Sequence, residues 1–149
     1  MSSAATLGTA LTCAKKSKIL REEVIDVTVP LFANIHLCGS ILTEVFFVLT
    51  VSLILYGSMP DFTTMFVFII LLGFFAIGAP GVPGGAIMAA LGILQSMLGF
   101  NETLQALMIA LYIAMDSFGT ACNVTGDGAL TLITDTFDQG QTGKASTAL

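Results

Sequence analysis

The chain has 149 residues, of which 55% are hydrophobic and 10% are charged, and its formal net charge is −5. Soluble domains carry roughly 25% charged residues, so this composition favours a membrane protein over a soluble enzyme. The acidic balance, together with the lack of a basic patch containing aromatic residues, argues against a nucleic-acid-binding protein.

The first half of the chain predicts a short helix and then an interrupted one. Residues 1–15 begin with serines and read as a short helix, and a basic cluster at 15–21 follows, which the positive-inside rule places on the cytoplasmic side. Residues 24–57 are apolar enough to span a bilayer, but polar residues and a glycine interrupt them at 34–40. We therefore expect a membrane-spanning helix that unwinds at mid-span and exposes backbone carbonyl groups there.

The next segment, residues 62–98, predicts a re-entrant helical hairpin. A long uncharged run extends from Asp61 to Glu102, and glycines and prolines interrupt it at 78–85. Each arm of the run has about 15 residues, whereas a helix needs about 20 to cross a bilayer. Two half-length helices joined by a tight tip therefore fit this run better than two complete spans.

Residues 103–134 predict a last transmembrane helix, which is amphipathic, and residues 135–149 a polar tail that we expect to be frayed or disordered. The fold class is therefore an all-α membrane protein with discontinuous transmembrane helices and a re-entrant hairpin. Broken helices that meet near the middle of the membrane are typical of secondary transporters.

One face of the last helix carries polar side chains. At about 100° per residue, the side chains that share this face are those of Asp116, Thr120, Asn123 and Asp127. Unpaired carboxylates inside a bilayer cost several kcal/mol. This face therefore predicts a binding site for a cation, a substrate amine or both.

Two aspartates within a membrane also bring an intramembrane aspartyl protease into consideration. Such an enzyme needs two carboxylates on facing helices that share a proton. Asp116 and Asp127 instead lie on one helix, about 16 Å apart at 1.5 Å per residue. The sequence therefore predicts neither a catalytic residue nor a cofactor, and the chain is not expected to be an enzyme.

Three segments resemble the dicarboxylate/amino acid:cation symporters, the family of the glutamate transporters and the neutral amino acid exchangers. Residues 116–127 resemble the last transmembrane helix of that family, residues 81–88 the tip and returning arm of its second hairpin, and residues 2–7 the serine-rich tip of its first hairpin. The resemblance covers essentially the whole chain.

That resemblance implies that residues 1–134 are the C-terminal part of a transport domain. Family members carry an N-terminal scaffold half that this sequence does not contain, and they assemble as homotrimers. The implied protein is an integral, multi-pass protein of the plasma or inner membrane, with the lipid bilayer and an amino acid as its partners. The alternative is a truncated or split-gene product that transports nothing on its own.

The resemblance also implies roles for the polar face. Asp116 aligns with the carboxylate that holds the substrate amino group, and Thr120 with a hydroxyl of the substrate pocket. Asn123 aligns with a residue that contributes to both substrate and cation binding, and Asp127 with a sodium ligand. Backbone amides at the two hairpin tips hold the substrate carboxylate in this family, which here implies those around Ser3, Ala79, Pro80 and Gly81.

Departures from the family pattern alter the expected substrate and ion. Gly119 stands where members that transport acidic substrates have an arginine, so a neutral or small amino acid is expected rather than a dicarboxylate or an acidic amino acid. His36 and Cys38 replace an amide and a carboxylate that bind sodium, and both are softer ligands. We therefore expect coupling to sodium (Na+), or to protons (H+) through His36 or Asp127.

Overall fold

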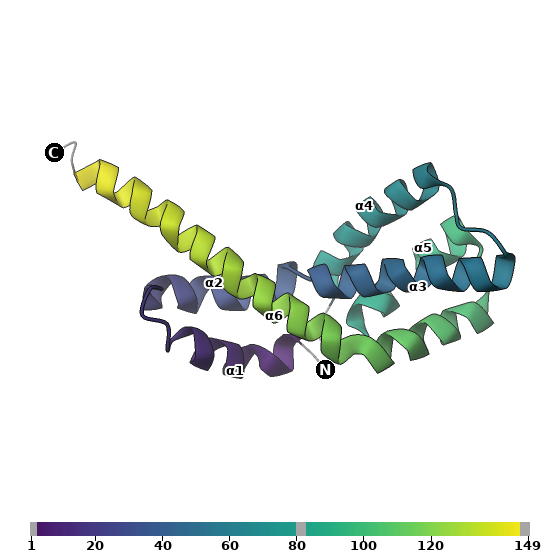
Figure 1. Cartoon of the computed structure of the whole chain (residues 1–149), viewed down its shortest axis with the longest axis horizontal. Helices are drawn as coiled ribbons and strands as arrows, with labels where there is room; N and C mark the ends of the chain where they lie inside the picture. Colours follow the sequence, from purple (N-terminus) through teal and green to yellow (C-terminus); the bar gives the residue numbers. More distant parts are fainter. Residues whose placement is uncertain (1–2, 80–82, 147–149) are drawn as a thin grey trace.

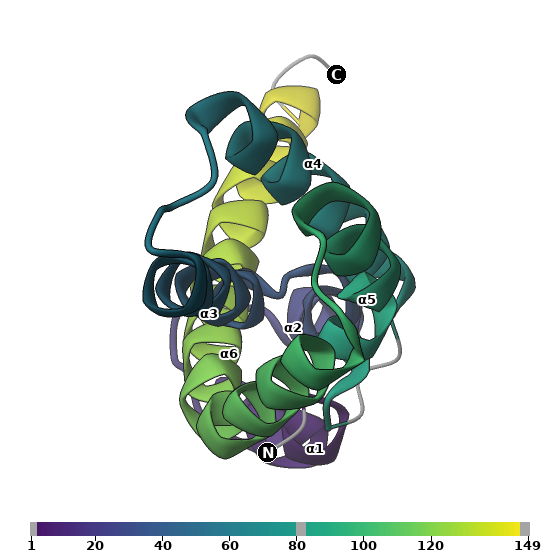
Figure 2. The same ribbon diagram turned by 90° about the vertical axis from the view of Figure 1, so that its right-hand side faces the viewer.

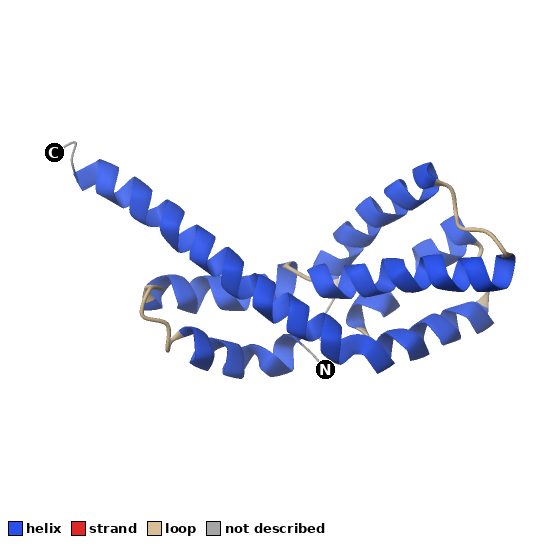
Figure 3. Ribbon diagram, viewed as in Figure 1, coloured by secondary structure: helices blue, strands red, loops and turns tan. Residues whose placement is uncertain are grey.

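The computed structural model describes residues 3–79 and 83–146, and every regular element in these ranges is an α-helix. Figure 3 shows the helices joined by short loops. In chain order the helices are α1 (Ser3–Ala14), α2 (Glu22–Ile35), α3 (Cys38–Tyr56), α4 (Phe62–Gly78), α5 (Gly85–Leu98) and α6 (Glu102–Ser146). The all-α prediction is confirmed.

The long helix α6 organises the fold. It runs past the other helices for most of the length of the molecule, and its C-terminal part projects beyond them (Figure 1). It packs against α1 and α2 on one side of its midpoint and against α3 and α5 on the other. The view along the long axis shows α3, α4 and α5 arranged beside α6 at this second end (Figure 2).

The predicted interruption lies between α2 and α3. α2 ends at Ile35 and α3 begins at Cys38, so His36 and Leu37 form the break. The His36 N–H still donates to the Phe32 carbonyl at 2.8 Å, which closes the last turn of α2. The two helices are therefore one interrupted span, and the backbone at the break is free to meet another element.

The predicted hairpin corresponds to α4 and α5, which pack against each other. α4 has 17 residues and is capped at its N-terminus by Asp61, whose carboxylate accepts a hydrogen bond from the Thr64 N–H at 3.0 Å. α5 has 14 residues and is followed by its C-cap, Gly99, which adopts a left-handed conformation with φ of 66°. Both helices are shorter than a bilayer span, and residues 80–82 between them lie outside the described part of the chain.

The apolar core lies at the hairpin end of the molecule. Its members come from α3, α4, α5, α6 and the connection between α5 and α6, and the most completely buried include Val48, Phe68, Leu72, Ile87, Leu94, Phe100 and Met108. Within the described part of the chain, two segments are long and apolar enough to cross a membrane: Glu22–Tyr56, with a mean hydropathy of 2.1, and Glu102–Gly140, with 1.4. The core therefore joins the hairpin to both of these segments.

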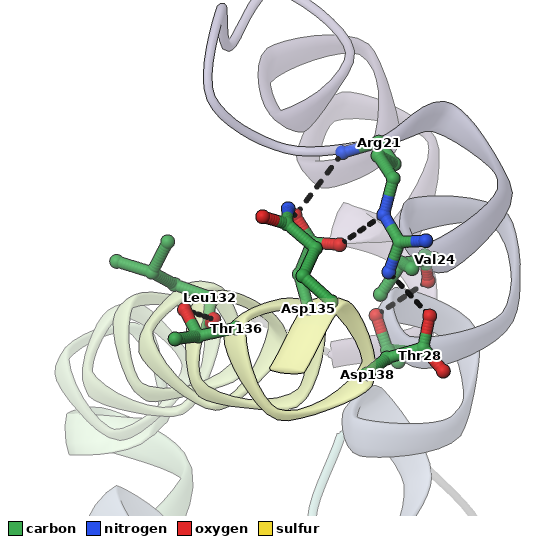
Figure 4. Close-up of polar contacts among 8 residues, drawn as sticks. Arg21, Val24, Thr28, Leu132, Asp135, Thr136 and Asp138 are labelled. Atoms are coloured by element: carbon green, nitrogen blue, oxygen red, sulfur yellow. Dashed lines mark hydrogen bonds and ion pairs between the residues drawn. The ribbon is translucent and has the colours of Figure 1, made fainter. Parts of the chain in front are cut away.

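The expectation of a helix ending near residue 134 with a frayed tail is wrong for residues 135–146, because α6 continues to Ser146, and residues 147–149 of the predicted tail lie outside the described part of the chain. The connection between α1 and α2 binds this part of the helix (Figure 4). The Arg21 guanidinium donates from Nε to Asp135 Oδ1 at 2.6 Å, its backbone N–H donates to Asp135 Oδ2 at 3.3 Å, and its Nη2 pairs with Asp138 at 2.5 Å. These contacts with a distant segment hold a polar sequence in the helix.

Candidate functional site

The polar face of α6 is buried and longer than predicted. It consists of six side chains spaced three or four residues apart, each at most 7% exposed: Asp116, Thr120, Asn123, Asp127, Thr131 and Asp135. Thr131 and Asp135 extend the predicted set by two further turns. The face meets α2, α3 and the break between them, because those elements supply the hydrogen-bond partners described next.

Asn123 joins α6 to the first turn of α3. Its Oδ1 accepts a hydrogen bond from the Gly39 N–H at 2.8 Å, and its Nδ2 donates to Ser40 Oγ at 3.0 Å. The N-terminal turn of a helix has N–H groups without partners inside the helix, and this amide satisfies one of them. Asn123 is thus positioned by the helix break, where the sequence predicted a cluster of polar groups.

Glycines allow α3 and α6 to come this close. A Cβ atom on Gly39 would lie 2.5 Å from the Gly119 carbonyl oxygen and 2.6 Å from Cys122 Cβ, so no larger residue fits at position 39 without movement. A Cβ on Gly119 would lie 3.5 Å from both the Gly39 carbonyl carbon and the Ser40 nitrogen, which is ordinary contact. The backbones of the two helices are therefore in direct contact beside Asn123.

His36 pairs with Asp127 at the break. The His36 Nδ1 and Asp127 Oδ1 atoms are 2.9 Å apart, and the Asp127 side chain is only 3% exposed. A Cβ on Gly126 would overlap His36 Cε1, so this glycine makes room for the imidazole ring. The His36 ring therefore occupies one oxygen of Asp127, the carboxylate that the resemblance predicts to bind sodium.

Cys38 is arranged differently from His36. Its side chain is exposed, and its Sγ points to the Cys122 carbonyl oxygen at 3.9 Å rather than to a carboxylate. Among the described residues there is no group of three or more His, Cys, Asp or Glu side chains that could hold a metal ion. A sodium site here would therefore depend on Asp127, Asn123 and backbone carbonyl oxygens rather than on a thiol.

Two carboxyl groups in this region have buried oxygens without a hydrogen-bond partner among the described residues. They are Oδ2 of Asp116 on α6 and both carboxyl oxygens of Glu44 on α3. Since a buried charge without a partner costs several kcal/mol, this arrangement calls for a cation or a proton.

The remaining predicted residues lie at the helix ends. Ala79 follows α4 and is 8% exposed, and Ser3 is the first residue of α1, which packs against α6. Pro80 and Gly81 lie outside the described residues.

Sequence reasoning assigned no role to Glu44, although a lone carboxylate in a long apolar run was a visible signal. It also missed Arg21 and Asp135, whose contact joins segments far apart in the chain.

Interrupted helices, two segments of the described chain long enough to cross a membrane and a buried polar face on α6 are features typical of membrane transporters of the secondary active class. The family model described as "Sodium:dicarboxylate symporter family" matches residues 1–137. The chain therefore belongs to the sodium:dicarboxylate symporter family, which confirms the resemblance seen in its motifs. No solved structure shows a significant match to the chain.

Proposed function

We propose that this chain forms the substrate- and cation-binding part of a symporter that moves a neutral or small amino acid together with sodium. The observation that carries the proposal is the buried face of α6, on which Asp116 has an oxygen without a partner among the described residues, two helical turns before Asn123, which contacts the start of α3. An ammonium group is the natural partner for a desolvated carboxylate. Asp116 would hold the amine of the substrate. Thr120 and Asn123 would contact the other main-chain atoms of the amino acid substrate.

The distribution of basic residues supports a neutral substrate. The five Lys and Arg residues of the chain lie at 15–21 and at position 144, and none lies between Glu22 and Gly143. A second carboxylate on the substrate would therefore find no cationic side chain on α2 to α5 or on the polar face of α6. Gly119, at the α3–α6 contact, leaves that position without charge, so a dicarboxylate or an acidic amino acid is disfavoured.

For the coupling ion we propose sodium at Asp127 and Asn123. Sodium prefers hard oxygen ligands, which these side chains and the carbonyl groups at the helix break supply. His36 already contacts Asp127, so its imidazole would turn away when sodium binds or would replace the ion as a proton carrier. Sodium and proton coupling are distinguished by the dependence of uptake on each gradient.

We further propose that the binding part moves against a scaffold half in a multi-pass protein of the plasma or inner membrane, assembled as a homotrimer. Exposed large apolar side chains on α3 and α4 support contact with lipid or with such a scaffold; they include Leu42, Phe46, Ile54, Phe62 and Phe74. The helices α4 and α5 would act as a re-entrant gate over the polar face.

The test is uptake of radiolabelled amino acids into liposomes that contain the purified chain, with an inward sodium gradient, a proton gradient or neither. We expect uptake of neutral amino acids with the sodium gradient and little uptake of glutamate. If no uptake occurs but a neutral amino acid binds in the presence of sodium, the chain is a binding part that requires its scaffold. If neither uptake nor binding occurs with any amino acid, the proposed function is wrong.

A further inference from the structure

The connection between α1 and α2 carries a cluster of basic residues, at the end of the molecule opposite the connection between α3 and α4 (Figure 1). Lys15, Lys16, Lys18 and Arg21 lie within seven residues, and no acidic residue of the sequence comes before α2. The connection leads directly into Glu22–Tyr56, which is long and apolar enough to cross a membrane. Clusters of four or more basic residues beside a membrane-spanning helix are typical of contact with anionic lipid.

Two of the four cations are paired within the protein. The Lys15 ammonium lies 3.0 Å from Glu22 Oε1 and 2.7 Å from Asp26 Oδ1. The Arg21 guanidinium pairs with two aspartates on α6. These contacts anchor the connection to α2 and α6, and they leave neither Lys15 nor Arg21 with an unmatched charge.

Lys16 and Lys18 are the two cations that remain. Both are exposed, and neither forms an ion pair with a residue that the structure describes. Hydrogen bonds order the backbone around them: the Lys16 N–H donates to the Cys13 carbonyl at 3.1 Å, and the Ile19 N–H donates to Ser17 Oγ at 3.3 Å. The turn that carries the two free ammonium groups is therefore formed before a ligand binds, which lowers the entropic cost of binding.

The charges of α2 place this connection at the level of the lipid headgroups. A charged side chain is costly in hydrocarbon, so the apolar core of the bilayer begins after Asp26, the last charged residue of α2. Asp26 lies five residues after Arg21, about 7.5 Å along the helix at 1.5 Å per residue. The headgroup layer of each leaflet is about 5–7 Å thick. The residues just before Arg21 therefore lie beside the phosphate groups.

Ile19 gives this turn an apolar side chain. It is 67% exposed, although a side chain of this size gains free energy when it leaves water. A soluble anion would leave Ile19 in water, whereas a lipid offers acyl carbons close to its phosphate. Lysine side chains reach phosphate groups from such a position while their apolar stems stay near the acyl chains. Two free ammonium groups beside one exposed aliphatic side chain therefore fit an amphiphilic anion.

We propose that the turn at 16–19 binds an anionic phospholipid. Lys16 and Lys18 donate to its phosphate group, and Ile19 lies against the start of its acyl chains. A zwitterionic lipid carries an ammonium group of its own beside the phosphate, which offsets this attraction, so the turn selects lipids with a net negative charge. None of these residues belongs to the proposed amino acid site, and the inference is therefore independent of the proposed transport function.

The experiment is native mass spectrometry of the full chain in mild detergent, titrated with phosphatidylglycerol or with phosphatidylcholine that has the same acyl chains. A lysine near an anionic headgroup strengthens binding about fivefold, so we expect the first phosphatidylglycerol to bind about 25-fold more tightly than the first phosphatidylcholine. Glycerophosphoglycerol, which is the same headgroup without acyl chains, should not displace the bound lipid at equal concentration. Equal binding of the two lipids would overturn the proposal. Displacement by the headgroup alone would overturn it as well, because the turn would then be a site for soluble anions.

Variants then locate the site. The double variant Lys16→Gln with Lys18→Gln removes both charges from exposed positions, so we expect unchanged helix content by circular dichroism and an affinity for phosphatidylglycerol that falls to that for phosphatidylcholine. The matched control, Lys16→Arg with Lys18→Arg, alters the same positions but keeps both charges, and it should bind phosphatidylglycerol as the unaltered chain does. Ile19→Ser should weaken the binding of both lipids, because their acyl chains are the same. If the two double variants bind phosphatidylglycerol equally, the lysine charges do not hold the lipid and the assignment is wrong.

Discussion

The contact between α3 and α6 predicts that two neighbouring glycines respond in opposite ways to the same substitution. A Cβ on Gly39 would lie 2.5 Å from the Gly119 carbonyl oxygen and 2.6 Å from Cys122 Cβ. The first atom belongs to the helix backbone and the second is the first carbon of a side chain, so neither can turn aside. Gly39→Ala must therefore push the two helices apart.

The expected cost can be worked from this geometry. Overpacking of a tight contact costs about 1–3 kcal/mol. The displacement also lengthens the hydrogen bond from the Gly39 N–H to Asn123 Oδ1, now 2.8 Å, and a typical bond of this kind contributes about 0.5–1.5 kcal/mol. Together we expect Gly39→Ala to lower the free energy of unfolding by about 1.5–4.5 kcal/mol.

Gly119→Ala is the matched control on the other side of the contact. Its Cβ would lie 3.5 Å from the nearest atoms of α3, an ordinary contact distance. Alanine also favours a helix interior over glycine by about 1 kcal/mol. We therefore expect Gly119→Ala to be neutral or stabilising.

The assay is unfolding of each purified variant in mild detergent by increasing amounts of a denaturing detergent, followed by circular dichroism. The reasoning predicts an earlier transition for Gly39→Ala and an equal or later one for Gly119→Ala. It would be refuted if the two variants unfolded together, or if Gly39→Ala were as stable as the unaltered chain.

Three further substitutions test separate parts of the account. Asp116→Asn removes the carboxylate proposed to hold the substrate amine, so sodium-dependent binding of a neutral amino acid should fall below detection in titration calorimetry; unchanged affinity would refute that role. Gly126→Ala should displace the His36 ring, since its Cβ overlaps Cε1, and NMR of ¹⁵N-labelled histidine should show a changed imidazole environment rather than the original signal. Asp135→Asn should weaken the contact with Arg21, and faster hydrogen exchange in α6 after residue 131 would be the sign; an unaltered exchange rate would count against this anchoring.

Much of the fold followed from local patterns in the sequence. Composition indicated a membrane protein, and the family assignment based on three motifs is confirmed by the match over residues 1–137. The break between α2 and α3 was predictable because a glycine and polar residues interrupt an apolar run at 34–40. The shared face of α6 was predictable because helical periodicity alone determines which side chains lie together. Whether α4 and α5 are re-entrant stays a prediction.

Long-range contacts could not be predicted in the same way. α6 continues to Ser146, and Arg21 contacts it at Asp135 across most of the chain, whereas local composition there indicated only a polar tail. The pairing of His36 with Asp127 and the close approach at Gly39 likewise arise from the packing of separate helices. Such contacts are set by tertiary structure and leave no periodic signal in the sequence.

The measurement that tests the central claim most directly is titration of the chain in lipid nanodiscs with a neutral amino acid, in sodium chloride and in choline chloride at equal ionic strength. If the buried face of α6 binds substrate and sodium together, binding should be saturable in sodium, much weaker in choline, and lost in Asp116→Asn. Binding of equal strength in both salts, unaffected by that substitution, would contradict the account.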